Sequence, residues 1–119
     1  MKKYSIDFNL MEMAQLIYAC NHALGKERNH FVQIFEYNVK ARKALENIKA
    51  KMFIAISENN YHIELDLMEI VQLYSACNMA WHHEKDEMEK QHDCKLAQYM
   101  RAVQDLEYAR EKILAALDK

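Results

Sequence analysis

Two short segments of this chain alternate strictly between apolar and polar residues. Residues 4–8 read YSIDF and residues 61–65 read YHIEL, with an apolar side chain at every second position. A period of two is typical of a short strand with one buried face. Because isolated strands of this length are unstable in water, we expect the two segments to pair as an antiparallel ribbon.

The residues that follow each predicted strand carry a helix-start signal. Asn9 stands three residues before Glu12, and Asp66 stands three residues before Glu69. This is the spacing of a capping box, in which both side chains accept hydrogen bonds from free backbone N–H groups at the helix start. Each segment then continues with apolar residues three and four positions apart, and a second such helix follows it. The predicted order is therefore strand–helix–helix, twice.

The apolar stripes predict which face of each helix is buried. The four predicted faces consist of Leu10, Met13, Ala14, Ile17, Cys20, Ala23 and Leu24; of Phe31, Ile34, Asn38, Ala41, Leu45, Ile48, Met52 and Ala55; of Leu67, Ile70, Val71, Tyr74, Cys77 and Trp81; and of Leu96, Tyr99, Val103, Leu106, Ala109, Ile113 and Leu117. The second stripe has the 3-4 spacing of an antiparallel bundle.

The chain also repeats itself. LMEMAQLIYACNHA begins at residue 10 and LMEIVQLYSACNMA begins at residue 67, whereas residues 45–58 resemble residues 106–119. We interpret this as an internal duplication within a single domain, 1–119, with units of approximately 4–58 and 61–119. The expected fold is mainly α: a duplicated strand–helix–helix unit forming a pseudo-symmetric four-helix bundle with a small two-stranded antiparallel ribbon. Strands left unpaired within the chain would instead pair across a homodimer.

Composition agrees with a helical globular protein and disfavours several classes of function. The 119 residues include no proline, one glycine and 51% hydrophobic residues. The net charge is −2 and opposite charges alternate, which argues against nucleic-acid binding.

No apolar run approaches the ~20 residues of a membrane span. The N-terminus lacks a signal-peptide pattern, and three cysteines without a disulfide framework favour a cytoplasmic location.

The motif ACN occurs in both repeats and suggests a symmetric polar pocket. Gln15, Asn21, Gln72 and Asn78 occupy corresponding positions at the edge of the two apolar stripes. One hypothesis is a small-molecule pocket at the repeat axis. The alternative is a structural contact that fixes helix register, as buried asparagines do in coiled coils. The cysteines of the motif face inward and are expected to behave as small hydrophobic residues.

Residues 81–94, WHHEKDEMEKQHDC, concentrate side chains that bind metals. His82, Asp86, His92 and Cys94 are the candidate ligands. No short, fixed ligand spacing of a known zinc motif results, and the first repeat has no counterpart. We therefore expect a solvated helix end and no metal or other cofactor. A metal-dependent enzyme that uses this cluster is a minor hypothesis.

Several aromatic side chains exceed what the predicted core needs. Phe35, Tyr37, Phe53 and Tyr108 are candidates for a protein-binding face, and eight methionines add adaptable apolar surface. The sequence carries no catalytic signature. We predict a non-enzymatic module that binds a partner protein and inhibits or regulates it. Its small size, internal duplication and lack of a catalytic signature resemble those of accessory proteins of phages and mobile elements, such as anti-defence factors. The alternative is a protein that sequesters or senses a small molecule.

Overall fold

The elements follow the order that the sequence predicts. The computed structural model describes residues 2–26, 39–90 and 96–119. These residues form β1 (Tyr4–Asp7), α1 (Leu10–Lys26), α3 (Val39–Ser57), β2 (His62–Leu65), α4 (Leu67–Lys90) and α5 (Leu96–Leu117). The predicted class is confirmed: the protein is mainly helical with a small two-stranded antiparallel sheet. Within the described ranges, no helix combines the length and the apolar character needed to cross a membrane.

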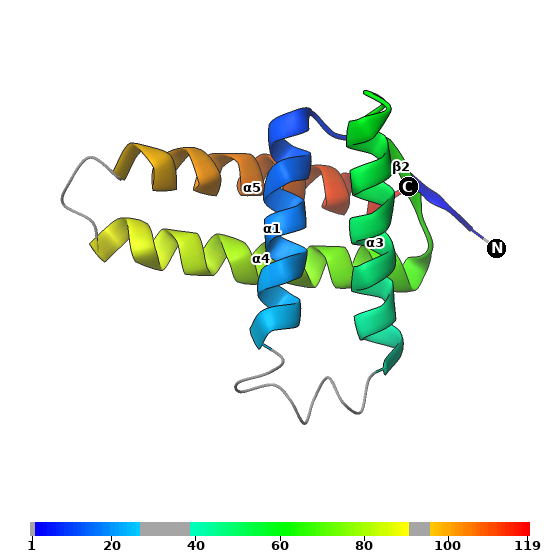
Figure 1. Cartoon of the computed structure of the whole chain (residues 1–119), viewed down its shortest axis with the longest axis horizontal. Helices are drawn as coiled ribbons and strands as arrows, with labels where there is room; N and C mark the ends of the chain where they lie inside the picture. The colour runs from blue at the N-terminus through cyan, green and yellow to red at the C-terminus, as the bar shows by residue number, and fades with distance from the viewer. Residues whose placement is uncertain (1, 27–38, 91–95) are drawn as a thin grey trace.

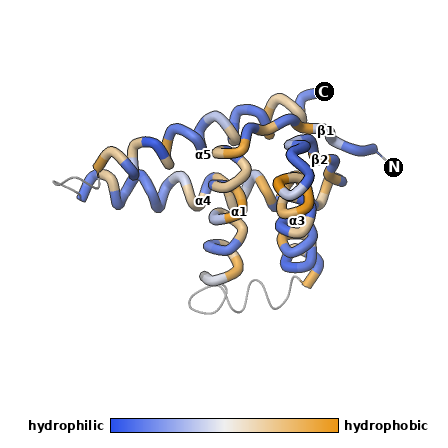
Figure 2. Tube along the Cα trace, turned by 45° about the horizontal axis from the view of Figure 1, so that its top comes forward, coloured by the Kyte–Doolittle hydropathy of each residue, from blue (hydrophilic) through white to orange (hydrophobic). Residues whose placement is uncertain are grey.

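The helices form two antiparallel pairs that cross each other. Figure 1 shows α1 beside α3 in one pair and α4 beside α5 in the other, with the first pair lying across the second. Figure 2 shows the same crossing after rotation about the horizontal axis. Helix α1 packs against α3, α4 and α5, and α4 packs against α1, α3 and α5. The arrangement is bundle-like, with α1 and α4 at its centre.

The ribbon forms within one chain, as predicted. Ile6 is paired with Ile63, and the backbone N–H of Phe8 donates to the carbonyl oxygen of Tyr61 at 3.0 Å. Ile6, Ile63 and Phe8 are buried, whereas the alternate polar residues are exposed. The strands therefore cover the core with one face, which is the reason for their strict alternation.

Both predicted capping boxes are present. The backbone N–H of Glu12 donates to Asn9 Oδ1 at 2.7 Å, and the N–H of Asn9 donates to Glu12 Oε1 at 2.8 Å. Asp66 and Glu69 make the equivalent pair of hydrogen bonds, both at 2.8 Å. Each cap lies directly after a strand, so it fixes the point at which the chain changes from ribbon to helix.

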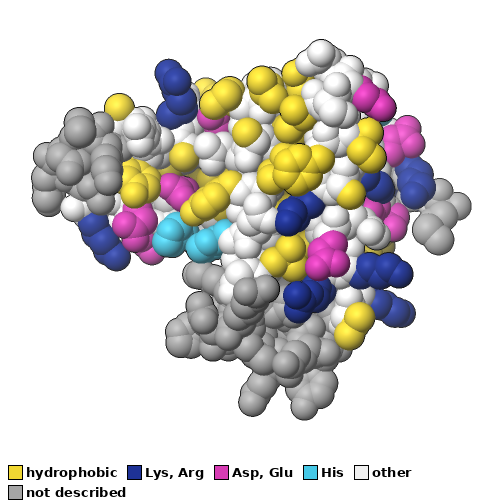
Figure 3. All heavy atoms as spheres, in the orientation of Figure 1, with side chains coloured by type: hydrophobic (Ala, Val, Ile, Leu, Met, Phe, Trp, Pro, Cys, Tyr) yellow, Lys and Arg dark blue, Asp and Glu magenta, His cyan; other side chains and the backbone are white. Residues whose placement is uncertain are grey.

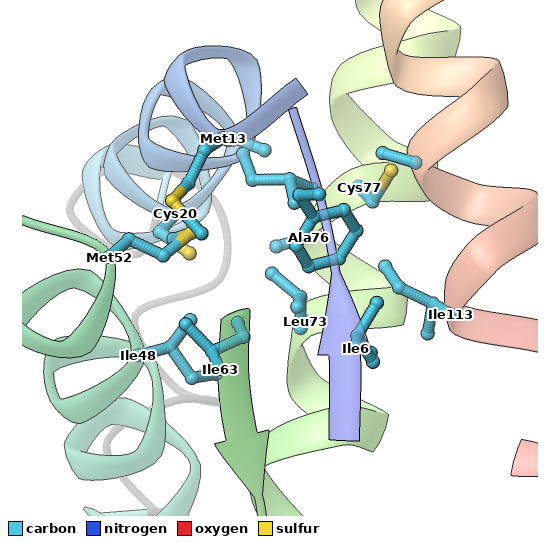
Figure 4. Close-up of a cluster of buried hydrophobic side chains, with 14 of the residues drawn as sticks. Ile6, Met13, Cys20, Ile48, Met52, Ile63, Leu73, Ala76, Cys77 and Ile113 are labelled. Atoms are coloured by element: carbon cyan, nitrogen blue, oxygen red, sulfur yellow. The ribbon is translucent and has the colours of Figure 1, made fainter. Parts of the chain in front are cut away.

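The core lies between the two helix pairs and beneath the ribbon. Figure 4 shows side chains from all six elements meeting there; those labelled are Ile6, Met13, Cys20, Ile48, Met52, Ile63, Leu73, Ala76, Cys77 and Ile113. The part of the second predicted stripe that lies in α3 is confirmed, because Ala41, Leu45, Ile48, Met52 and Ala55 are all buried. Phe31, Ile34 and Asn38 of the same stripe lie outside the described residues. Buried apolar area of this kind is the main stabilising contribution to such a fold.

The predicted faces of α1 and α4 were partly wrong. Leu67 is 57% exposed, and Leu10, Ala14 and Val71 are also exposed. Met13, Cys20 and Ala23 in α1 and Ile70 and Cys77 in α4 are buried as predicted. The buried faces are shifted around the helices to include Leu16 and Ala19 in α1 and Leu73, Ala76 and Ala80 in α4. The helices that cover α1 and α4 determine this shift. Of the predicted α5 face, Leu96 is exposed at the start of the helix, whereas Leu106, Ala109 and Ile113 are buried.

Candidate functional site

Two of the three buried glutamates in the described residues have a lysine partner from another element. Glu12 is 2% exposed and accepts from Lys112 Nζ at 2.6 Å. Glu69 is 4% exposed and accepts from Lys51 Nζ at 2.9 Å. Each carboxylate therefore caps its own helix and also holds a neighbouring helix. The helix cap and the ion pair together are sufficient to explain why both carboxylates are buried.

The third buried glutamate, Glu84, lines a hollow between α1, α4 and α5. The hollow has a volume of about 340 Å³ and is lined by Ala14, Gln15, Tyr18, Glu84, Gln98, Tyr99 and Ala102. Two phenol rings, two carboxamides and a carboxylate thus face one small space. This combination of aromatic walls with a few convergent polar groups is typical of a ligand site.

The chemistry of the hollow is dominated by Glu84 and Tyr18. Glu84 is 8% exposed. Burial raises the pKa of the Tyr18 hydroxyl, and a hydrogen bond to Glu84 and the charge of Glu84 raise it further. The hydroxyl therefore stays protonated at neutral pH and serves as a donor to the carboxylate.

Two histidines lie beside the hollow. The rings of His22 and His83 are 4.6 Å apart between centroids, and the ring of Tyr18 stacks on His22 at 5.9 Å. Figure 3 shows histidine, acidic and hydrophobic side chains gathered on this face, where α4 extends past α1. The cluster brings together residues that are distant in the sequence.

The four residues of the predicted polar pocket lie in different surroundings. Gln15 lines the hollow that contains Glu84, whereas Asn21 lines a separate hollow beside α3, with Arg42 and Lys49. Gln72 donates to Met68 Sδ at 3.8 Å within α4. Asn78 Oδ1 accepts from Arg110 at 3.0 Å, so it joins α4 to α5. Neither of these two hollows is lined by Gln72 or Asn78.

Both cysteines of the ACN motifs face the core, as expected. Cys20 and Cys77 are fully buried and free, and the Cys77 thiol donates to the carbonyl oxygen of Leu106 at 3.3 Å. Burial raises the pKa of each thiol to about 12. Since the thiolate is the nucleophilic form, neither cysteine is activated for catalysis at neutral pH.

The candidate metal ligands are only partly described. His82 and Asp86 are exposed, one turn apart on α4, and the ring of His82 lies edge-on against Trp81. His92 and Cys94 lie outside the described residues. Within the described ranges, no group of three His, Cys, Asp or Glu side chains is placed to hold a metal ion.

The two described residues of the candidate partner face lie on different helices. Phe53 on α3 is 56% exposed, and Tyr108 on α5 is exposed. Gln104 Nε2 donates to the Tyr108 hydroxyl at 3.0 Å. Phe35 and Tyr37 lie outside the described residues.

Sequence reasoning missed the hollow, although one signal for it was present. Glu84 follows Cys77 and Ala80 at intervals of three and four residues, so it continues the buried stripe of α4. An acidic residue in such a stripe indicates a buried carboxylate that needs partners. The pairing with Tyr18 was not readable from the sequence, because the crossing of α1 and α4 brings the two residues together.

Comparisons of the chain with models of protein families, with curated proteins and with solved structures found no match. The fold consists of two crossed helix pairs and a two-stranded ribbon.

Proposed function

We propose that this protein is a non-enzymatic module that binds another protein and inhibits or regulates it. The observation that carries the proposal is a set of large apolar side chains that remain exposed on its helices. Leu67, Met68 and Val71 are all more than 40% exposed at the start of α4. Phe53 and Ile54 are more than half exposed on α3.

The grouping of these side chains favours an interface. Residues three and four positions apart on a helix lie close together, so Val71 adjoins both Met68 and Leu67 and the three form one apolar surface on α4. Scattered single apolar residues are normal on a protein surface, whereas adjoining ones often mark binding sites. Phe53 adds an aromatic ring, a side chain that is enriched at interface cores.

The exposed apolar positions also correspond between the two proposed repeats. Leu10 and Met11 match Leu67 and Met68, and Phe53 matches Leu114, which is also exposed. The Lys–Glu pairs match in the same way, because Lys51 corresponds to Lys112 and Glu69 to Glu12. We infer a duplicated, pseudo-twofold architecture that offers two related apolar surfaces to a partner. An accessory factor of a phage or mobile element that blocks a bacterial defence protein is one concrete form of this function.

Site-specific photo-crosslinking tests the proposal. A benzophenone amino acid replaces Leu67 or Phe53 in turn, and Glu89, an exposed residue on α4, serves as the matched control position. In its natural cellular setting, we expect one adduct of the same partner from the two apolar positions and none from position 89. An adduct of two copies of this chain would instead identify a homodimer. Absence of adducts, or the same adducts from position 89, would contradict the proposal.

A further inference from the structure

We propose that the hollow between α1, α4 and α5 binds an organic cation, with the Glu84 carboxylate as the counter-ion. The cation is an ammonium or guanidinium group on an alkyl chain. This inference goes beyond the protein-binding proposal and does not depend on it. A free alkylamine carries the same ammonium group as a lysine side chain, and a free alkylguanidine carries the same guanidinium group as an arginine side chain.

Comparison of the three buried glutamates provides the first argument. Glu12 and Glu69 each have a lysine nitrogen within 3.0 Å. In the part of the chain that the structure describes, no lysine or arginine forms an ion pair with Glu84. A buried carboxylate is costly unless charge and hydrogen bonds compensate it, and its two oxygens accept about four hydrogen bonds. Tyr18 supplies one donor, and a bound cation would supply the charge.

The walls of the hollow provide the second argument. Tyr18 and Tyr99 both line the space beside Glu84. Aromatic rings attract cations through the negative potential of their faces. The carboxamide oxygens of Gln15 and Gln98, which line the same hollow, are further acceptors for N–H groups.

The electrostatic environment of Tyr18 agrees with this assignment. The Glu84 and Glu87 carboxylates both act on the Tyr18 hydroxyl, and each of them raises its pKa. The nearby field therefore has the sign that attracts a cation and repels an anion. The volume, about 340 Å³, is near the lower end for small-molecule sites and suits an alkylammonium or alkylguanidinium group.

Calorimetric titration of the full chain with defined probes tests the inference. The cationic probes are cadaverine as a free amine, and N-acetyl-arginine amide and a short arginine-containing peptide as models of a partner's side chain. N-acetyl-citrulline amide is the neutral control for the arginine probe, because it has a similar shape without the charge. We expect binding of cationic probes only, with affinity falling as salt is added.

Matched variants localise the binding. Glu84→Gln preserves the shape of the side chain and removes its charge, so it should weaken binding by about tenfold to a hundredfold. Glu89→Gln removes an exposed charge from the same helix and should bind like the wild-type protein. In the wild-type protein, the side-chain amide NMR signals of Gln15 and Gln98 should shift on titration, which tests the site even where Glu84→Gln fails to fold.

The outcomes distinguish the source of the cation. Binding of cadaverine without the arginine probes would support a site for free amines, and binding of the arginine amide or of the arginine-containing peptide would support a partner's side chain. No binding of any cationic probe, equal binding of the citrulline probe, or unchanged affinity of a folded Glu84→Gln variant would overturn the inference.

Discussion

At the scale of single residues, Glu12 and Glu69 form ion pairs with distant residues in addition to the helix caps that their local sequence predicts. Glu12 caps α1 through Asn9 and also pairs with Lys112 on α5. Glu69 makes the equivalent contacts with Asp66 and Lys51. Each carboxylate lies at a helix start, where negative charge is favoured, and it also forms an ion pair with a second helix. Loss of either carboxylate therefore removes a cap and an ion pair together.

The first prediction concerns Glu12. Glu12→Ala should lower the free energy of unfolding by about 2–4 kcal/mol, because a helix cap and a hydrogen bond to a charged group are lost together. Glu12→Gln preserves the capping hydrogen bonds, so it should cost less than Glu12→Ala. Urea denaturation followed by circular dichroism measures both values.

The control for this prediction is Glu46→Ala. Glu46 is exposed on α3 and pairs only within its helix, with Arg42 at 3.7 Å among the described contacts. Its replacement should change stability by less than about 0.5 kcal/mol. If Glu12→Ala and Glu46→Ala were equally mild, the structural role assigned to Glu12 would be wrong.

At the scale of elements, the ribbon is the smallest unit and the one most dependent on its neighbours. A two-stranded ribbon alone is marginal in water, so β1 and β2 are stable because their apolar face covers the helices. Ile6 and Ile63 pair with each other across the ribbon and reach the core together (Figure 4). The ribbon thereby fixes where α1 and α4 begin.

The second prediction concerns this pair. Ile6→Ala and Ile63→Ala should each destabilise the protein by about 2–4 kcal/mol, because each deletes buried methyl and methylene groups. The double variant should lose less than the sum of the two, since the side chains share contacts. Thermal and urea denaturation give the three values.

Ser5→Ala is the matched control on the other face of β1, because Ser5 is exposed. It should change stability by less than about 0.5 kcal/mol. A strictly additive double variant, or a Ser5→Ala effect as large as that of Ile6→Ala, would argue against the shared core contact.

At the scale of the whole molecule, the two halves of the chain are interlocked. Strand β1 pairs with β2, Glu12 in the first half pairs with Lys112 in the second, and Lys51 pairs with Glu69 across the same boundary. Helices α1 and α4 also cross at the centre of the core (Figure 1). Neither half contains the partners of its own strand or of its own buried glutamate.

The third prediction follows from this interlocking. Fragments 1–59 and 60–119 should each show little helix as monomers, and mixing them should restore the helical circular dichroism signal. The reason is that each fragment exposes its half of the core until the other half covers it. Sedimentation of the mixture should give a one-to-one complex. A fragment that folds cooperatively as a monomer would show that the halves are independent units.

The sequence by itself determined the identity of the local elements. The alternation in residues 4–8, the cap of Asn9 and Glu12, and the 3-4 stripe of α3 all predicted what the structure contains. These signals are local, because strand alternation, helix period and helix capping depend on residues only a few positions apart. The pairing of β1 with β2 was predictable for a different reason: no other strand was available in the sequence pattern.

Only the tertiary structure decided which faces are covered and which distant residues meet. An apolar stripe shows that a helix packs, but it does not specify the angle of the helix that covers it, so Leu67 was wrongly expected in the core. The Lys112–Glu12 pair and the hollow of Tyr18 and Glu84 likewise join helices that are remote along the chain. These contacts depend on the crossing of the two helix pairs, and that crossing results from the packing of the whole core.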